Sequence, residues 1–431
     1  MFEDNILWFR HIRKKDIPRV GGKGANLGEM TAANFPVPPG FCVTAQAYFA
    51  YLEQSGLKEK IISLIDAIDV ENSEQLQRVS KEVREFIKAT PMSQELSGEI
   101  QRSYQQLGEK KLAWLTSAEE CYVAVRSSAT AEDLPEASFA GQQETYLNVR
   151  GRKNVVNAVQ RCWASLFTAR AVYYRKKQGF STEQVGISVV IQKMVDSEVA
   201  GVMFTSSPTG DEAKIIIEAA YGLGEAVVSG SITPDTYTVD KGSAKLLEKR
   251  VASQEFRIIR KGRENVKETL SSATAKKQKL TDKEIIDIAK VGRQIEAHYK
   301  SPQDIEWAIE GKEIYIVQSR PITTLGLKRD DATQKDVADQ VKKFEDRIIL
   351  KGLAASPGIV SGKTRVIPSI DDISKVQEGD VLVTAMTSPD WVPTMKKATA
   401  IITNEGGSTC HAAIVSRELG IPCVIGTKIA T

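Results

Sequence analysis

A chain of 431 residues exceeds what one hydrophobic core of ordinary size can hold, so its length predicts two or three domains. Its composition, 42% hydrophobic and 26% charged, is typical of a globular protein that dissolves in water. The net charge is only +3, and both signs are scattered along the sequence. Composition therefore gives no reason to expect nucleic acid or an anionic membrane as a partner.

The cysteines, the histidines and the N-terminal residues indicate the setting in which the protein works. The five cysteines form no CxxC pair and only three histidines are present, so the sequence predicts neither a disulfide framework nor a zinc site. The first ten residues hold an acidic pair and an apolar run of only four, too short for a signal peptide or a spanning helix. We therefore expect a cytoplasmic protein with reduced thiols.

The first notable stretch is glycine-rich and covers residues 20–30. Gly21, Gly22 and Gly24 surround Lys23, and a helix is expected to follow. The stretch is not a Walker A loop, because no glycine stands five residues before Gly22 and Gly24 replaces the required Ser or Thr. By itself the pattern is also compatible with a plain surface turn.

A helical scaffold is predicted over residues 46–115, and a buried strand follows it. This strand is expected to end in Arg126, before a run of hydroxyls and carboxylates. A buried strand that delivers an arginine to a polar loop suits an anion-binding site. The alternative is a solvated loop in which Arg126 pairs with Glu132 or Asp133.

A long helix is predicted from residue 154 to residue 178, and a second buried strand over residues 186–195. The strand is nearly continuous in apolar residues, which is typical of a central position in a sheet. Gln192 is its exceptional polar member. Burying a lone amide costs free energy unless something binds it, so Gln192 is a candidate for base or ribose recognition.

Residues 254–284 contain charges of both signs and few aromatic residues, which favours a solvent-exposed segment over a nucleic-acid-binding patch. Thr281 and Glu284 form a capping box that predicts a helix running to about residue 298. Residues 301–321 then predict a β-hairpin that turns near Gly311 and Lys312.

The hairpin concentrates polar side chains that suit a nucleotide. Alternation along its first strand places Asp304 and Glu306 on one face. The same alternation along its second strand predicts one face shared by Ile314, Ile316, Gln318 and Arg320. Carboxylates close to an arginine and an amide fit a divalent metal with a triphosphate, whereas the alternative is a polar face in solvent.

The most informative stretch lies near the end of the sequence and centres on His411. A short apolar strand over residues 400–402 leads to two glycines, after which Ser408 and Thr409 offer side-chain oxygens where a helix would begin. His411 falls in the first turn of that helix, where backbone N–H groups and the helix dipole favour an anion. Its buried stripe is predicted at Ala412, Val415 and Leu419, and its end at Gly420 and Pro422.

The sequence GGSTCHAAIVSRELGIP over residues 406–422 resembles the phosphohistidine signature of the PEP-utilising enzymes, in particular the phosphoenolpyruvate synthase (pyruvate, water dikinase) family. Residues 388–397 are similar to the segment that precedes this signature in the family. Residues 21–27, 123–130, 139–142 and 304–321 look like the ATP-grasp nucleotide-binding domain of the same enzymes. The resemblance therefore covers nearly the entire chain, and it implies that His411 becomes phosphorylated.

The resemblance also implies roles for the residues that match the family's motifs. Lys23, Arg126 and Arg320 would hold phosphates, with Arg126 and Arg320 acting in catalysis beside His411. The nucleotide pocket would be lined by Gly141, Thr145 and Gln192. Glu306 and Gln318 would bind Mg²⁺ or nucleotide, and Asp304 is a further candidate metal ligand.

The implied fold is mixed, α+β or α/β, with an ATP-grasp nucleotide-binding domain followed by a β/β/α phosphohistidine swivelling domain. The expected boundaries are residues 1–323 for the first domain, in two lobes of roughly 1–200 and 201–323. A charged linker would follow over residues 324–350, and the phosphohistidine domain over residues 351–431. Only five residues follow Gly426, so we expect this last domain to be incomplete.

Enzymes of this family continue into a barrel that binds pyruvate and PEP, and such a barrel needs on the order of 250 residues. The sequence does not contain it, so pyruvate or PEP would be engaged only through a missing C-terminal domain or a partner in trans. The implied activity is ATP-dependent phosphorylation of His411, with Mg²⁺ as cofactor, as the first half of PEP synthesis from pyruvate, ATP and water. AMP, phosphate and PEP are the products.

Two alternatives remain open. One is a half-enzyme of the pyruvate phosphate dikinase or antibiotic phosphotransferase type, although residues 324–350 leave no room for the acceptor domain that a rifampin enzyme inserts there. The other is a non-catalytic ATP-binding module derived from a dikinase. Such a module would bind ATP but produce neither AMP nor an acid-labile phosphoprotein.

Overall fold

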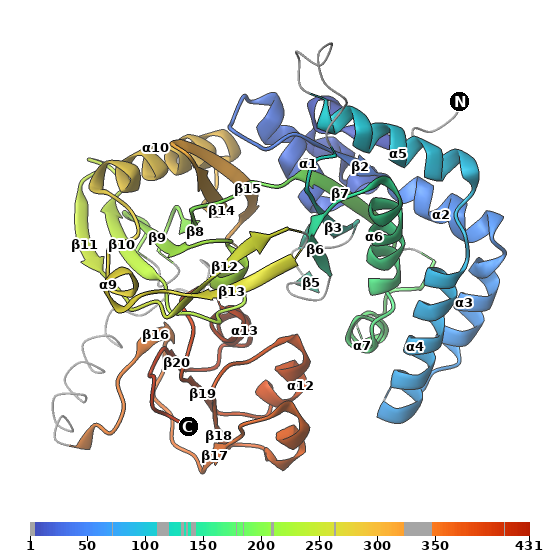
Figure 1. The fold of residues 1–431 in the computed structure, drawn as a ribbon. Helices are drawn as coiled ribbons and strands as arrows, with labels where there is room; N and C mark the ends of the chain where they lie inside the picture. Colours follow the sequence, from blue (N-terminus) through green and yellow to red (C-terminus); the bar gives the residue numbers. More distant parts are fainter. Residues whose placement is uncertain are drawn as a thin grey trace. The chain divides into compact units, whose positions relative to one another are not determined.

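The fold was analysed in a computed structural model, which describes residues 5–70, 72–109, 120–130, 133–134, 137–138, 144–177, 179–183, 185–207, 211–262, 264–322, 347–408 and 410–431. The architecture is mixed α/β, with several separate sheets (Figure 1). The chain divides into two compact units. The first unit comprises Met1–Val195 and Arg260–Asn265, and the second comprises Asp196–Ile259 and Val266–Thr431.

The first unit is built on a five-stranded sheet in the order β1-β2-β7-β3-β6, in which every neighbouring pair is antiparallel. β7 is central and its first six residues are buried, which confirms the predicted apolar central strand. The strands are β1 (Ile6–Trp8), β2 (Gly40–Val43), β3 (Val123–Ala129), β6 (Thr145–Val149) and β7 (Ile187–Lys193), with a separate short pair, β4 (Asp133–Leu134) and β5 (Ala137–Ser138).

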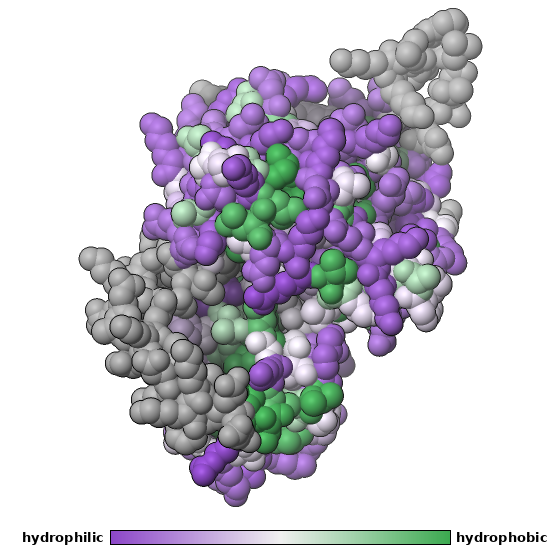
Figure 2. Space-filling model, turned by 90° about the vertical axis from the view of Figure 1, so that its left-hand side faces the viewer, coloured by the Kyte–Doolittle hydropathy of each residue, from purple (hydrophilic) through white to green (hydrophobic). Residues whose placement is uncertain are grey.

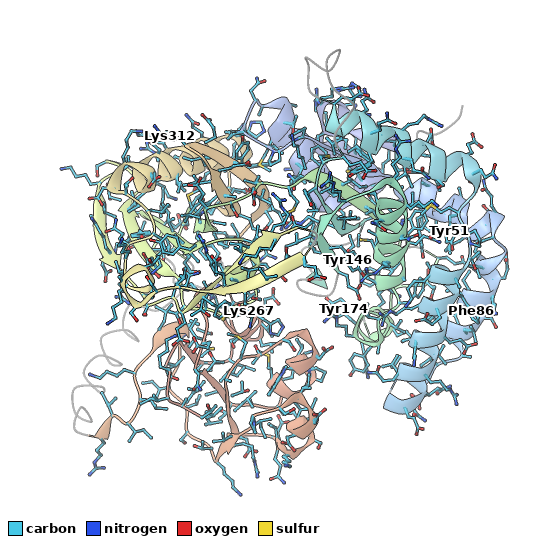
Figure 3. All side chains as sticks on the ribbon, in the orientation of Figure 1. Tyr51, Phe86, Tyr146, Tyr174, Lys267 and Lys312 are labelled. Atoms are coloured by element: carbon cyan, nitrogen blue, oxygen red, sulfur yellow. The ribbon has the colours of Figure 1, made fainter. Side chains whose placement is uncertain are left out.

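Helices pack against this sheet and form most of the unit's core. Thr44, Asn72 and Ser93 cap three of them, because each side chain accepts a hydrogen bond from a backbone N–H of the first turn. The hydroxyl of Tyr51, labelled in Figure 3, donates to the carbonyl of Ile87 at 2.8 Å and so ties two helices together. The helices are α1 (Ile17–Ala32), α2 (Ala45–Gln54), α3 (Leu57–Asp66), α4 (Ser73–Ala89), α5 (Gln94–Gly108), α6 (Arg152–Ser165) and α7 (Ala169–Lys177).

Two predictions for this unit are wrong in detail. The single helix expected over residues 154–178 is two helices, α6 and α7, separated by a short turn at residues 166–168. β3 does not end at Arg126 but continues to Ala129, so Arg126 stands in the middle of the strand. The hydroxyls of Ser127 and Ser128 are buried within that strand, where they bond to the carbonyls of Glu144 and Val20.

The second unit contains a six-stranded antiparallel sheet in the order β11-β10-β9-β8-β14-β15. The predicted hairpin is confirmed as β14 and β15, with its turn at Gly311 and Lys312. The strands are β8 (Val199–Phe204), β9 (Lys214–Tyr221), β10 (Asp235–Asp240), β11 (Leu246–Arg250), β14 (Gln303–Glu310) and β15 (Glu313–Pro321).

Helix α10 (Asp282–Tyr299) covers one face of this sheet, as Figure 1 shows. The predicted capping box is confirmed: the Glu284 carboxylate accepts the Thr281 N–H at 2.7 Å, and the Thr281 hydroxyl accepts the Glu284 N–H at 3.3 Å. At Gly292 the helix meets Met203, whose Cε would lie 2.5 Å from a Cβ at that position. The short helices α8 (Glu225–Val228) and α9 (Ser272–Ala275) also belong to the second unit. The two-stranded ribbon of β12 (Phe256–Lys261) and β13 (Glu264–Thr269) belongs to it except for Arg260–Asn265, which are part of the first unit.

The end of the second unit holds another five-stranded sheet, in the order β16-β20-β19-β18-β17. Four of its strands run parallel and β16 is antiparallel to its neighbour β20. Its core is formed by sheet residues and by the helices around His411. The elements are β16 (Leu353–Ser356), β17 (Thr364–Val366), β18 (Val381–Thr384), α12 (Val392–Met395), β19 (Ala400–Thr403), α13 (His411–Leu419) and β20 (Cys423–Ile425).

The surface drawn in Figure 2 is mainly hydrophilic, with smaller apolar areas between the polar ones. Within the described ranges, none of the helices has both the length and the apolar character that crossing a bilayer requires.

Candidate active site

Three predicted site residues of the first unit lie on one face of its sheet. Arg126 on β3 stands opposite Thr145 on β6, and Gln192 on β7 stands opposite Ala124, two residues before Arg126. Side chains two apart on a strand point the same way, and directly opposed residues share a face, so the three form one group. Arg126 is only 9% exposed, whereas Thr145 is open to solvent.

Gln192 has the environment that its sequence position predicts. Its side chain is 1% exposed, and the Nε2 amide has no hydrogen-bond acceptor among the described residues. A buried donor without an acceptor costs about 1–3 kcal/mol. A ligand that accepts a hydrogen bond on this face would remove that cost.

Lys23 is brought towards the same strand by a kink in α1. Gly21 has a φ of 67°, and a Cβ there would lie 2.3 Å from the Ser128 hydroxyl, so this position requires glycine. The N–H of Gly24 donates to the same hydroxyl at 3.3 Å. Burial raises the pKa of the Cys162 thiol, and Lys23 is close enough to oppose this rise. The glycine-rich stretch therefore packs on β3, two residues from Arg126.

The predicted polar group of the hairpin is present in the second unit. Asp304 stands opposite Arg320 and Glu306 stands opposite Gln318 across β14 and β15. The guanidinium of Arg320 contacts one Asp304 carboxylate oxygen through Nη2 at 2.8 Å and through Nε at 2.9 Å. Burial raises the pKa of Asp304, and the neighbouring Arg320 opposes the rise. These four side chains share one face of the sheet.

The predicted position of the two isoleucines on that face is wrong. The register shifts between Glu306 and Trp307, so that Glu306 opposes Gln318 while Trp307 opposes Ile316. Val317 is the extra residue of a β-bulge, which turns Ile314 and Ile316 to the opposite face. Ile316 is fully buried there beside Trp307. The bulge therefore places Gln318 and Arg320 on the polar face without the isoleucines.

Glu218, on β9, extends the polar row across the sheet. Glu306 opposes Val202 on β8, and Val202 opposes Glu218. Neighbouring strands are separated by about 4.8 Å, so the backbones of Glu306 and Glu218 are roughly 10 Å apart on one face. Glu218 is completely buried. The available sequence signal was a single glutamate within an otherwise apolar strand, since a buried carboxylate needs a partner. The sequence did not identify that partner.

His411 begins helix α13, as predicted, and Gly420 ends the helix in the left-handed conformation. The N-cap residue is Cys410, whose side chain makes no capping hydrogen bond, so Ser408 is not the N-cap as its hydroxyl suggested. Thr409, the other expected capping residue, lies outside the described residues. The Nδ1 of His411 lies 2.9 Å from the hydroxyl oxygen of Thr387. Nothing in the sequence pattern singled out Thr387.

The loop that precedes His411 is fixed through both backbone groups of Ser408. Its N–H donates to the Glu218 carboxylate at 2.6 Å, and its carbonyl accepts from Nη2 of Arg417. Arg417 also donates through Nε to the Ala355 carbonyl at 2.8 Å. Burial lowers the pKa of Arg417, and Glu218 opposes that change. The histidine loop is therefore held against the face of the sheet that carries Glu306 and Gln318.

A second set of polar contacts joins the same two parts of the second unit. The ammonium of Lys428 lies 2.7 Å from a Glu405 carboxylate oxygen and 2.6 Å from the Thr233 hydroxyl. That hydroxyl lies 3.3 Å from the same carboxylate. Close packing accompanies these contacts: a Cβ at Gly407 would lie 2.9 Å from both carboxylate oxygens of Glu218.

The donor set of the hairpin face is compatible with Mg²⁺. Gln318 Oε1 is buried without a hydrogen-bond donor among the described residues, and it belongs to the side chain opposite Glu306. Magnesium is usually held by one or two protein oxygens, with phosphate and water oxygens completing its shell. The carboxylate of Asp304 is occupied by Arg320, which makes it the weaker candidate of the three. Within the described ranges, no three His, Cys, Asp or Glu side chains gather as a metal-binding group.

The predicted site residues are thus divided between the units. Lys23, Arg126, Thr145 and Gln192 belong to the first, and Asp304, Glu306, Gln318, Arg320 and His411 belong to the second. Gly141 lies outside the described residues, as does most of the linker expected over residues 324–350.

Two family models match the chain. Residues 17–341 match the pyruvate phosphate dikinase AMP/ATP-binding domain, and residues 376–431 match the mobile domain of PEP-utilising enzymes. All the predicted site residues fall within these two ranges.

Curated relatives are similar over nearly the whole chain. A probable phosphoenolpyruvate synthase of Archaeoglobus fulgidus is 54% identical over 426 residues, which cover 99% of this chain and 55% of the relative. The phosphoenolpyruvate synthase of Pyrococcus furiosus is 51% identical over 99% of this chain and 56% of its own length. A probable phosphoenolpyruvate synthase of Methanothermobacter thermautotrophicus is 51% identical, with 60% of its length covered.

The chain therefore spans somewhat more than half the length of these relatives. The match to the nucleotide-binding model extends over most of the chain and contains both polar faces described above. This chain belongs to the family of the pyruvate phosphate dikinase AMP/ATP-binding domain, joined to a mobile domain of the PEP-utilising enzymes.

Proposed function

We propose that this chain binds ATP and transfers a phosphoryl-containing group from it to His411, as the first half of PEP synthesis from pyruvate, ATP and water. Residues 1–323 form an ATP-grasp domain in this proposal, and residues 351–431 a phosphohistidine swivelling domain. The main support is the position of His411, at the N-terminus of α13 in a loop whose Ser408 N–H binds Glu218. Glu218 shares its face of the sheet with Glu306 and Gln318.

Each polar group has a role in holding the nucleotide. Lys23, Arg126 and Arg320 neutralise phosphate charge, and Arg320 is kept in place by Asp304 at 2.8 Å. Gln192, Thr145 and Gly141 contact the rest of the nucleotide. The buried Nε2 of Gln192 gains its hydrogen bond from that contact.

Glu306 and Gln318 are the residues that would hold Mg²⁺, with Asp304 as a lesser candidate. When bound, the ion would add positive charge beside the phosphate oxygens, where charge develops during phosphoryl transfer. The protein's own part is to orient these oxygens in line with the imidazole.

The transfer itself forms one N–P bond and breaks one P–O bond. An imidazole nitrogen of His411 attacks the β-phosphorus of ATP, and the bond from that phosphorus to the α-phosphate oxygen breaks. AMP leaves, and the histidine carries the β- and γ-phosphates as one pyrophosphoryl group. Water then takes the terminal phosphoryl group as phosphate. The remaining phosphohistidine is the donor to pyruvate in the whole protein. The contact between Glu218 and Ser408 represents the position in which His411 is presented to ATP.

Incubation of the chain with Mg²⁺ and ATP carrying a label in the β-phosphate tests this proposal. The expected result is AMP together with an acid-labile label on the protein, and neither appears with His411→Ala. Equal labelling of that variant would contradict the assignment of His411. If the wild-type chain binds ATP but takes up no label, the result would favour the non-catalytic ATP-binding module.

ATP labelled in the γ-phosphate distinguishes the acceptors. A water-dependent enzyme releases labelled phosphate without added phosphate. An enzyme of the pyruvate phosphate dikinase type requires added phosphate and forms labelled pyrophosphate. Pyruvate remains the proposed final acceptor, and PEP formation by the whole protein tests that step.

A further inference from the structure

The geometry around His411 points to a residue that controls how the histidine reacts. We propose that Thr387 is a positioning residue, which holds the Nδ1 of His411 and so fixes the tautomer and the ring orientation for transfer at Nε2. The inference rests on the proposed phosphorylation of His411, but its structural part can be measured without any nucleotide. In this role Thr387 contacts the imidazole ring rather than the phosphate, so it is a positioning residue and not a catalytic one.

The direct observation is the 2.9 Å separation between the Thr387 hydroxyl oxygen and His411 Nδ1. Thr387 is 3% exposed, so water competes poorly for this contact. A hydroxyl oxygen can accept a hydrogen bond, and a neutral imidazole carries its proton on one nitrogen only. When Nδ1–H donates to Thr387, the lone pair on Nε2 is available for attack.

The loops that carry the two residues are tied to each other by the backbone. Thr387 follows β18 and His411 follows β19, and these strands pair in parallel up to Thr384 and Thr403. Beyond the strands, the Asn404 N–H donates to the Thr384 carbonyl at 3.2 Å. The Glu405 N–H donates to the Ala385 carbonyl at 3.1 Å. The two side chains are therefore set in register before any ligand binds.

The same contact suits the phosphorylated state. After transfer at Nε2, the proton on Nδ1 remains, so its hydrogen bond to Thr387 is kept throughout the reaction. Attack by Nδ1 would instead require that bond to break and the ring to turn. Thr387 thus favours attack by Nε2 over attack by Nδ1, and it takes no part in the bonds that form and break.

Histidine labelled with ¹⁵N gives the most direct test, because the chain contains only three histidines and His411→Ala identifies the relevant signals. Without ATP, the full chain is expected to show His411 mainly as the Nδ1–H tautomer. Thr387→Val should shift the tautomer population towards Nε2–H, and Thr387→Ser should restore it. Thr394→Val changes a buried threonine of the same domain and serves as the control. A wild-type ring with its proton on Nε2 would overturn the proposal.

Phosphorylation by ATP and Mg²⁺ provides the second readout. The isomer of phosphohistidine, separated after alkaline hydrolysis, should be the Nε2 form in the wild type. Loss of a hydrogen bond to a group that becomes charged should slow labelling of Thr387→Val by about 10- to 100-fold, with ATP affinity unchanged. Label on Nδ1, or a valine variant with the wild-type rate and tautomer, would contradict the role of Thr387. Absence of label from the wild type would instead contradict the proposed phosphorylation of His411. The tautomer measurement would still show whether Nδ1 donates its proton to Thr387.

Discussion

The carboxylate of Glu218 accepts a hydrogen bond from the backbone N–H of Ser408 at 2.6 Å, across 190 residues of sequence. Glu218 lies in a six-stranded sheet and Ser408 lies three residues before His411. The contact links the face that carries Glu306 and Gln318 to the loop that leads to His411.

Glu218→Ala is expected to slow phosphorylation of His411 while leaving ATP affinity within about threefold. The loss removes a charge-assisted hydrogen bond, which is worth about 1.5–3 kcal/mol and corresponds to roughly a 10- to 150-fold change in rate. Labelling with β-labelled ATP and a separate nucleotide-binding titration measure the two quantities. Glu212→Ala, at an exposed position just before the same strand, is the control. Unchanged labelling of the Glu218 variant would show that the contact does not position the histidine loop.

Gly407→Ala tests the same contact by steric means. A Cβ at this position would lie 2.9 Å from both Glu218 carboxylate oxygens and 3.0 Å from Pro234 Cγ, so the loop must shift. We expect slower labelling than in the wild type. Gly242→Ala is the matched control, because its Cβ would meet only an Asp240 oxygen at 3.6 Å. Equal rates for both variants would mean that the loop accommodates the methyl group without losing its position.

Arg320→Ala is expected to lower the rate of His411 labelling strongly while changing the stability of the fold little. The side chain of Arg320 is 34% exposed, so its ion pair with Asp304 contributes at most about 1 kcal/mol to folding. As a proposed phosphate ligand, however, the same residue should matter greatly, and labelling of His411 should fall at least about 100-fold. Arg250→Ala removes a more exposed ion-paired arginine from the same sheet and should change neither quantity. Retained labelling in the Arg320 variant would show that Arg320 is not a phosphate ligand.

Features controlled by adjacent residues were predictable from the sequence. The capping box at Thr281 and the hairpin turn at Gly311 were predicted where they occur, because each depends on a few neighbouring residues. The helix that starts at His411 and stops at Gly420 was predictable for the same reason. The nearly continuous apolar run of residues 186–195 also identified the central strand β7.

The remaining features depend on information that periodicity does not carry. One extra residue at Val317 reverses the facing of Ile314 and Ile316, and no alternation pattern signals such an insertion. The partners of Glu218 and His411 come from distant positions, 190 and 24 residues away, and become neighbours only through strand order. The turn between α6 and α7 likewise interrupts a run that has helical character throughout.

Lys279→Met should be among the most destabilising single changes in the second unit. Lys279 and Asp235 form an ion pair at 2.8 Å in which both side chains are 0% exposed. The Lys279 ammonium also donates to the Ala252 carbonyl, at 2.5 Å. Removing the ammonium leaves the Asp235 carboxylate buried without its countercharge, which costs about 3–5 kcal/mol.

Urea denaturation followed by tryptophan fluorescence measures that cost. Lys283→Met provides the matched control, since Lys283 is paired with Asp287 but is 88% exposed, and its loss should change stability by less than about 0.5 kcal/mol. A Lys279 variant as stable as this control would show that the other donors to Asp235 suffice without the ammonium.

Asp380 makes the stability of the sheet that carries His411 depend on pH in a defined direction. One Asp380 carboxylate oxygen accepts the Gln377 N–H and the Arg365 Nε, both at 2.9 Å. These bonds, that of Gln377 first, hold the pKa of Asp380 below its ordinary value. A carboxyl group whose pKa is lower in the folded state contributes stability above its unfolded pKa of about 3.9, and this is lost as the pH falls through the folded value.

The wild type and Asp380→Asn should therefore differ most in melting temperature at neutral pH, with the wild type higher. The difference should stay constant down to about pH 4 and then shrink, because protonation of Asp380 makes the wild type resemble the variant. Thermal melts of the full chain between neutral pH and about pH 2.5 measure this, with Asp371→Asn, at an exposed position nearby, as the control. A difference that grows as the pH falls would reverse the sign and rule out the carboxylate as the stabilising form.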